Sequence, residues 1–192
     1  LTEQRWVAVC MSSGMEGIGL SWSGQTAAVL RARYEDREYQ EFLKGLFSGV
    51  VRKACHDCKR YQVQLLREGI LFDGFFFDTA LGAYVLDPTE KSFALVDVSA
   101  EYAPQLSADE APLADENAFS PLTGEEEGVR ALGLVSRAVF AMTPTMKEKL
   151  HEHGMDKLYY EIELPLCEIL ARMQHIGMRV DRTALLEFGA QL

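Results

Sequence analysis

The stretch Trp6–Ser13, WVAVCMSS, decides the fold, because its eight residues are apolar or uncharged and rich in valine. Such a short run predicts a β-strand buried on both faces, as found inside an α/β sheet. Ligand sites in open α/β sheets gather at the carboxyl ends of strands, here near Cys10 and Ser12. These two side chains share a face because side chains alternate along a strand. A metal-dependent hydrolase needs carboxylates at such a position, and this sequence offers a thiol and a hydroxyl.

The residues that follow predict a meander of strands and then a helix. Two further apolar runs, Gly17–Ser23 and Thr26–Leu30, are separated by a glycine-containing two-residue break that is typical of a hairpin. A one-sided apolar pattern then predicts an amphipathic helix that Gly49 ends. The residues of that pattern are Tyr39, Phe42, Leu43, Leu46 and Phe47. A short strand is expected at Val50–Cys55.

The middle of the chain predicts mainly helices. A helix is expected over Val63–Glu68, and Asp78 is placed to cap another that runs through Val85. A short helix is expected within residues 92–103, and a long loop over residues 104–123. The next helix is expected over Glu125–Met142, with Thr143-Pro144 capping a restart that ends at Gly154.

The last part of the chain has the most regular apolar spacing. One helical face carries Leu158, Ile162, Leu166, Ile169, Leu170, Met173 and Ile176. Pro165 should bend this helix or mark a restart, Gly177 should end it, and Asp181 should cap the next one. The order of strands and helices predicts an α/β protein with a mixed sheet.

Composition narrows the classes of function. The 192 residues carry 19 basic and 29 acidic side chains, a net charge of −10. Nine of the acids lie between Ser92 and Val129, where no lysine or arginine occurs. This acidic stretch suits a solvated loop, and an acidic domain repels phosphate, so weak intrinsic binding of DNA or RNA is expected. No secretory signal or membrane span is expected, and the apolar surroundings of Cys10 and Cys167 suit reduced, buried thiols of a cytosolic protein. The chain ends in mid-pattern, so it is expected to be a piece of a longer protein.

Local motifs offer other chemistry, each with a simpler structural interpretation. Cys55 and Cys58 have the CxxC spacing of thiol–disulfide exchange sites. The sequence offers no second pair of cysteines for a four-ligand zinc site. The structural alternative is that the two thiols lie near a strand end without a function. His151 and His153 are spaced so that they do not face each other on a helix. Glu125–Glu127 suits a solvated helix start.

Two stretches resemble the 3′–5′ exonuclease region of bacterial family A DNA polymerases. The first is Phe77–Pro88, FDTALGAYVLDP. The second lies within Leu158–Leu192 and contains EIELPL at Glu161, LARM at Leu170 and GMRVD at Gly177, and it resembles the passage that joins the exonuclease domain to the polymerase thumb. The resemblance implies an α/β, ribonuclease H-like mixed sheet flanked by helices, with C-terminal helices leading to an absent polymerase thumb. It divides the chain into an exonuclease-like domain, residues 1–157, and connecting helices, residues 158–192.

Active members of that family hold two divalent metals with four carboxylates. Matched residue by residue, the first pair falls on Cys10 and Ser12, the third on Tyr61, and the last on about Arg137, with Gly133 where a tyrosine is expected. Magnesium and manganese require hard oxygen ligands and offsetting negative charge. The resemblance therefore implies a degenerate domain without catalytic, metal-binding or cofactor-binding residues.

The expected function is a non-catalytic support within a DNA polymerase I whose intact chain carries out template-directed DNA synthesis. Magnesium is expected only in the absent polymerase domain, and DNA is expected to bind only through the intact protein. The expected partner is the polymerase domain of the same chain, in a cytoplasmic monomer with no membrane contact. The alternatives are an active metal-dependent 3′–5′ exonuclease with relocated ligands, drawn from Asp57, Asp73 and Asp78, and a thiol oxidoreductase.

Overall fold

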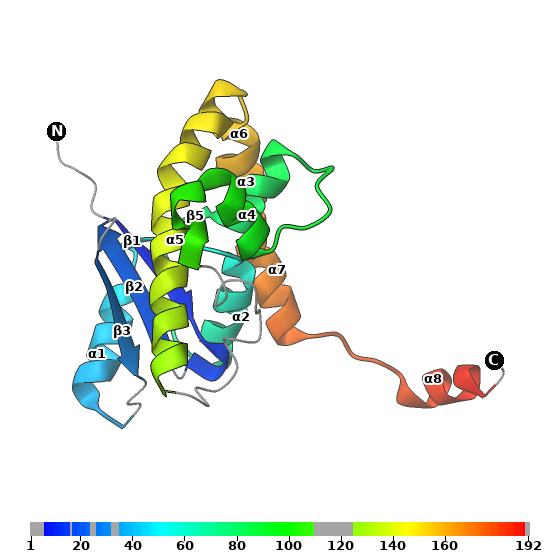
Figure 1. The fold of residues 1–192 in the computed structure, drawn as a ribbon. Helices are drawn as coiled ribbons and strands as arrows, with labels where there is room; N and C mark the ends of the chain where they lie inside the picture. Colours follow the sequence, from blue (N-terminus) through cyan, green and yellow to red (C-terminus); the bar gives the residue numbers. More distant parts are fainter. Residues whose placement is uncertain (1–5, 16, 24–25, 32–34, 110–124, 191–192) are drawn as a thin grey trace.

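The structure is a computed structural model that describes residues 6–15, 17–23, 26–31, 35–109 and 125–190 (Figure 1). Its centre is a five-stranded sheet with the order β3-β2-β1-β4-β5. The strands are β1 (Trp6–Met11), β2 (Gly17–Ser23), β3 (Thr26–Arg31), β4 (Arg52–Cys55) and β5 (Phe75–Asp78). The first three pair antiparallel, whereas β4 pairs parallel to both β1 and β5, so the predicted mixed sheet is confirmed.

Strand β1 is the middle strand of the sheet. Ala8 lies opposite Ser21 of β2 on one side and opposite Ala54 of β4 on the other. The side chains from Val7 to Met11 are all buried. The apolar run that predicted a strand covered on both faces therefore forms one, because each face of the sheet must be shielded from water.

Helices cover the two faces and create two separate cores. The helices are α1 (Arg37–Leu46), α2 (Cys58–Arg67), α3 (Thr79–Leu86), α4 (Leu95–Tyr102), α5 (Glu125–Glu152), α6 (Asp156–Leu158), α7 (Leu164–Ile176) and α8 (Arg182–Gly189). Val7, Val9 and Met11 pack with α1 and α2 in one core. Ala8 and Cys10 belong to the other core, which α3, α4 and α5 complete.

Helix α5 corrects one prediction. It continues unbroken through Pro144, although Thr143-Pro144 was expected to cap a restart. Met142 and Met146 are fully buried on either side of the proline, and the hydroxyl of Thr143 donates a 2.7 Å hydrogen bond to the carbonyl of Val139. Burial of these neighbours outweighs the backbone hydrogen bond that a proline removes from a helix. The helix ends at Glu152, just before Gly154 adopts a left-handed φ of 69°.

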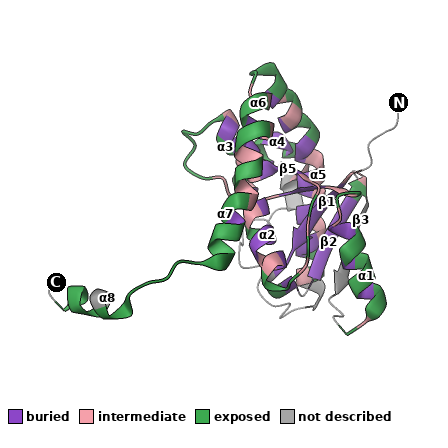
Figure 2. Cartoon of the chain, turned by 180° about the vertical axis from the view of Figure 1, so that it is seen from behind, coloured by how far each residue is buried: buried purple, intermediate pink, exposed green. Residues whose placement is uncertain are grey.

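The C-terminal run forms a π-helical turn and then a new helix. Residues Tyr159–Glu163 make the π-helical turn, and α7 begins at Leu164 with Pro165 in its first turn, so the predicted restart is confirmed. Helix α7 packs on α2, and Gly177 ends it with a φ of 73°. Much of its outer surface is exposed, and α8 lies beyond it at the end of an extended connection (Figures 1 and 2).

The remaining predictions fall in three groups. The hairpin of β2 and β3, the amphipathic helix α1 and the short helix α4 are confirmed, although α1 ends at Leu46 rather than at Gly49. Strand β5 was not predicted as a separate strand. Most of the predicted 104–123 loop lies outside the described residues, and its start, Pro104–Asp109, is a 3-10 helix. In the part of the chain that is described, no helix has the length and apolarity needed to cross a membrane.

Helix α5 lies so close to β2 that only glycine fits at residue 19. A Cβ added to Gly19 would lie 2.3 Å from the carbonyl oxygen of Leu132, which is backbone and cannot swing away. We expect Gly19→Ala to lower the free energy of unfolding by about 1–3 kcal/mol, because α5 must shift from the sheet.

The matched control is Gly45→Ala in α1, where an added Cβ meets no atom within 4 Å. This change should raise the free energy of unfolding by about 0.5–1 kcal/mol, since alanine is the better helix former. Denaturant titration of both variants measures the difference, and equal stability of the two variants would contradict the close approach of α5 to β2.

Candidate functional site

The candidate site is the carboxyl end of β1 together with the residues that α2 and α5 bring towards it, and we call it the strand-end site. Ser12 is fully buried there. Its hydroxyl accepts a 2.8 Å hydrogen bond from the N–H of Gly17, and its carbonyl accepts a 3.1 Å bond from the side chain of Gln64. Ser12 therefore closes the connection between β1 and β2 and fixes it to α2, which is a structural role.

Tyr61 reaches the same place from α2. Its side chain is buried and forms hydrogen bonds with the thiol of Cys10 and with the backbone of Met11. Burial raises the pKa of Cys10 to about 12 and raises the pKa of Tyr61 well above its usual value. Both groups are consequently neutral at physiological pH, and neither supplies the negative charge that a divalent cation requires.

Arg137 and Gly133 lie on α5, which packs against β1 and β2. The carbonyl of Gly133 accepts a 3.0 Å hydrogen bond from Ser136, whereas Nε of Arg137 is buried and has no hydrogen-bond partner among the described residues. A cleft of about 400 Å³ next to Tyr61 is lined by Val135 of this helix rather than by Arg137. Helix α5 therefore presents an apolar side chain to this cleft, whereas active members of the resembled family carry a metal-binding carboxylate on the corresponding helix.

Asp57 is the acidic residue that lines this cleft. It caps α2 from a left-handed conformation, with a φ of 59°, and its carboxylate accepts a 3.3 Å bond from the N–H of Arg60. Its neighbour His56 contacts the hydroxyl of Thr79 at 2.9 Å. A lone exposed carboxylate cannot offset the charge of two divalent ions.

Asp78 is buried and uses its carboxylate to hold two turns together. Oδ1 accepts bonds from the N–H groups of Asp57 at 2.9 Å and Ala80 at 3.0 Å, and Oδ2 accepts one from Cys58 at 2.7 Å. These contacts confirm the predicted capping of α3 and add a bond to the start of α2 that the sequence did not reveal.

Tyr159 completes this arrangement from the π-helical turn. Its hydroxyl accepts a 2.7 Å bond from the N–H of Asp78 and donates a 2.9 Å bond to the carbonyl of Asp78. The two residues are 81 positions apart in sequence. No local signal points to such a contact, and the apolar spacing of the C-terminal run indicated only that this segment is helical.

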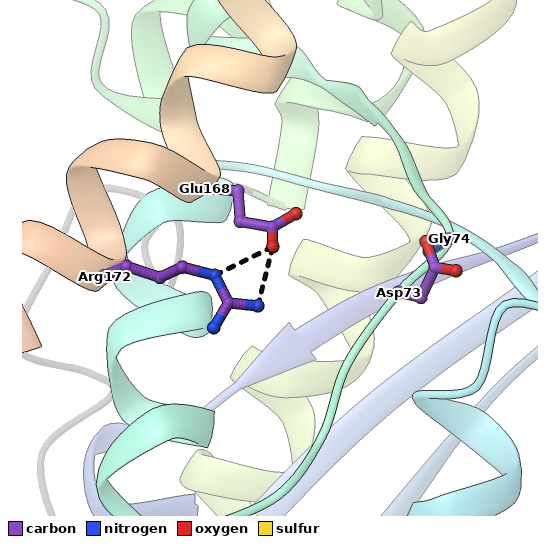
Figure 3. A network of polar contacts seen from close by, with 4 residues as sticks. All are labelled: Asp73, Gly74, Glu168 and Arg172. Carbon is purple, nitrogen blue, oxygen red and sulfur yellow. Dashed lines mark hydrogen bonds and ion pairs between the residues drawn. The ribbon is translucent and has the colours of Figure 1, made fainter.

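Asp73, the third relocated candidate, lies before β5 and therefore at the amino end of that strand. It accepts a hydrogen bond from the N–H of its own neighbour Gly74, and Figure 3 shows it apart from the Glu168–Arg172 ion pair of α7. Burial lowers the pKa of Lys53 to about 8, and the charge of Asp73 partly opposes this shift. Asp73 thus belongs to the opposite end of the sheet, and the three relocated candidates do not form one site.

The remaining motifs have structural explanations. Cys55 and Cys58 are both buried, and burial raises the pKa of Cys55 to about 11, which is opposite to the shift that activates a thiol for exchange. His151 contacts Asp156 at 2.6 Å, and the exposed His153 donates a 2.7 Å bond to the carbonyl of Lys149. The two histidines therefore contact different groups, Asp156 and the carbonyl of Lys149.

The fold defines the class of protein, an α/β domain with a mixed sheet covered by helices on both faces. The family model described as "DNA polymerase I, ribonuclease H-like domain" matches residues 13–111. The chain belongs to this family.

Several curated relatives are bacterial DNA polymerases I. The chain is 34% identical over 157 residues to DNA polymerase I of Geobacillus stearothermophilus. The matched region covers 79% of this chain and 17% of the relative. It is 25% identical over 175 residues to the Bacillus subtilis (strain 168) protein, covering 91% of this chain and 20% of the relative. The chain thus spans a small part of the length of these relatives.

Solved structures show the same fold. The POL domain of Pol1 from M. smegmatis, in complex with DNA primer-template and dNTP, matches with a TM-score of 0.77 and 22% identity, covering 100% of this chain and 31% of that one. The apo form of a nuclease matches with a TM-score of 0.71 and 14% identity, covering 93% of this chain and 88% of the other. At these identities the likeness concerns the fold.

The Tyr159–Asp78 contact can be tested by removing one oxygen. Tyr159→Phe leaves the buried N–H of Asp78 without the hydroxyl that accepts its hydrogen bond, so we expect the free energy of unfolding to fall by about 1–3 kcal/mol. Tyr160→Phe is the control, because the hydroxyl of Tyr160 is buried and has no partner among the described residues. The control should change stability little or raise it slightly. Denaturant titration decides, and an equal loss in both variants would contradict the role given to Tyr159.

Proposed function

We propose that this chain is a non-catalytic, exonuclease-like domain of a DNA polymerase I. The observation that carries the proposal is the state of the strand-end site, where Cys10, Ser12 and Tyr61 are buried. Tyr61 is hydrogen-bonded to the thiol of Cys10, and Ser12 accepts a bond from the N–H of Gly17. These groups are neutral, and the positive charge of Arg137 lies on the helix that packs against the same strand. Two divalent ions about 4 Å apart need several carboxylates, so this set of donors does not suit them.

The proposed role is structural support for the polymerase part of the same protein. Residues 1–157 form the exonuclease-like domain in this proposal, and residues 158–192 lead towards the thumb. The exposed apolar residues of α7, among them Ile169, Met173 and Ile176, suit burial against further protein. Template-directed DNA synthesis, with its magnesium and most of its DNA contacts, then belongs to the parts of the relatives that this chain does not span.

The net charge of −10 supports the proposal that other parts of the protein make most of the DNA contacts, since an acidic domain repels the phosphates of DNA. The intact protein is proposed to be monomeric and cytoplasmic, as a polymerase with its partner domain in the same chain. The alternative of an active exonuclease with relocated ligands has one exposed carboxylate in its favour, Asp57. Asp78 already serves four backbone N–H groups, and Asp73 lies at the other end of the sheet.

A nuclease assay tests this proposal. The purified chain is incubated with a 3′-labelled single-stranded oligonucleotide and either Mg²⁺ or Mn²⁺, and release of label is followed. We expect no release above the buffer control, because the strand-end site lacks the anions that would hold the metals. Asp57→Ala and Ser12→Ala are assayed in parallel.

The paired variants separate true activity from contamination. Digestion by the parent chain that disappears in Asp57→Ala or Ser12→Ala would overturn the proposal in favour of relocated ligands. Digestion that is equal in all three preparations but separates from the chain on size-exclusion chromatography would come from a contaminating nuclease, whereas digestion that elutes with the chain would overturn the proposal.

A further inference from the structure

Two thiols and a carboxylate meet where α2, β5 and α7 come together. Cys58 is the first residue of α2, Asp78 is the last of β5, and Cys167 lies in the first half of α7. One sulfur or oxygen atom from each lies within 4.8 Å of the other two. Cys58 and Asp78 are buried, and Cys167 is partly buried. Among the described residues the cysteines are free thiols rather than disulfides. Neither the family fold nor the strand-end site accounts for this group, which we call the thiol cluster.

The thiols of the cluster form hydrogen bonds with each other. Cys58 is hydrogen-bonded to Cys167 and also to Cys55, which lies beside the cluster but outside the group of three. The hydrogen bond to Cys58 is the main cause that raises the pKa of Cys167, and burial adds to it. A cation that binds the two sulfurs takes the place of the thiol protons.

We propose that Cys58, Cys167 and Asp78 form a binding site for one thiophilic divalent cation of the zinc class, with a solvent molecule as the fourth ligand. The two thiolates are soft ligands that favour zinc over magnesium, and zinc also accepts a carboxylate oxygen. The protons of the two thiols leave to solvent when the ion binds. Binding thus needs no oxidant or other reactant.

The geometry is close to what a tetrahedral site requires. With zinc–sulfur bonds of about 2.3 Å, two sulfur ligands lie about 3.8 Å apart. The observed spread, within 4.8 Å, requires only a small contraction. Asp78 is already oriented by the N–H groups of Asp57, Cys58 and Ala80, which also offset part of the negative charge that the cluster gains.

A route from solvent reaches the cluster. A surface cleft of about 290 Å³ is lined by Asp78 and Cys167, with two carboxylates, Asp57 and Glu163, and one cation, Lys59, on its walls. An ion can therefore approach past carboxylates and reach two of its three protein ligands, and solvent in the cleft can supply the fourth. Once bound, the ion would tie α7 to α2 and to the end of β5.

Cobalt(II) is the probe for this site, because thiolate ligation gives it a characteristic charge-transfer absorption. The reduced, metal-free chain is titrated with Co²⁺ and then with Zn²⁺. We expect one Co²⁺ per chain, displacement by one equivalent of Zn²⁺, and no competition from excess Mg²⁺. Cys58→Ser and Cys167→Ser should each weaken binding by at least about tenfold, since each removes a thiolate ligand.

Cys10→Ser is the matched control, because Cys10 is also a buried thiol but belongs to the core on the other face of the sheet. It should bind Co²⁺ like the parent chain. Far-ultraviolet circular dichroism of each variant verifies folding, and Cys167 is the better test position because it is only partly buried. Absence of stoichiometric Co²⁺ binding, or an equal loss in the folded Cys10→Ser variant, would overturn the proposal. The result is independent of the nuclease assay.

Discussion

The carboxylate of Asp78 is the contact on which the rest of the structure depends. It lies at the end of β5, and its oxygens accept hydrogen bonds from the backbone at the starts of both α2 and α3. Its own backbone is held by Tyr159, so the C-terminal helices are anchored to the same point. Charge-assisted bonds of this kind are stronger than neutral ones, and they satisfy helix N–H groups that would otherwise be buried without partners. One residue thereby joins the ends of two parallel strands, the starts of two helices and the π-helical turn at Tyr159–Glu163.

A fold of this class does not need its metal ligands in order to persist. Strand β1 is stabilised by burial on both faces and by pairing on both edges, and Cys10 and Ser12 fit that environment as small, neutral residues. Carboxylates at the same positions would cost desolvation energy and would repel each other in the absence of ions. Cys10 and Ser12 therefore suit a well-packed strand end, which supports the proposal that this end of the sheet holds no metal.

The sequence predicted those parts of the fold that rest on local patterns. The valine-rich run of β1, the glycine-marked hairpin and the cap of α3 by Asp78 all follow from residues near one another in the chain. Pro144 was misleading because its local preference is outweighed by burial of Met142 and Met146. The Tyr159 contact and the meeting of Cys58 with Cys167 could not be predicted, since each joins residues that only the folded chain brings together.

The π-helical turn at Tyr159–Glu163 determines how the following helix, α7, is rotated about its axis. A helix advances about 100° per residue, so loss of a single residue from this wider turn would rotate α7 by that amount about its axis. Cys167 and Ala171 would then swing away from α2, and the outward-facing apolar stripe would turn with them. The turn thus fixes the rotation of α7 about its axis, and with it the direction in which the exposed apolar residues of α7 face.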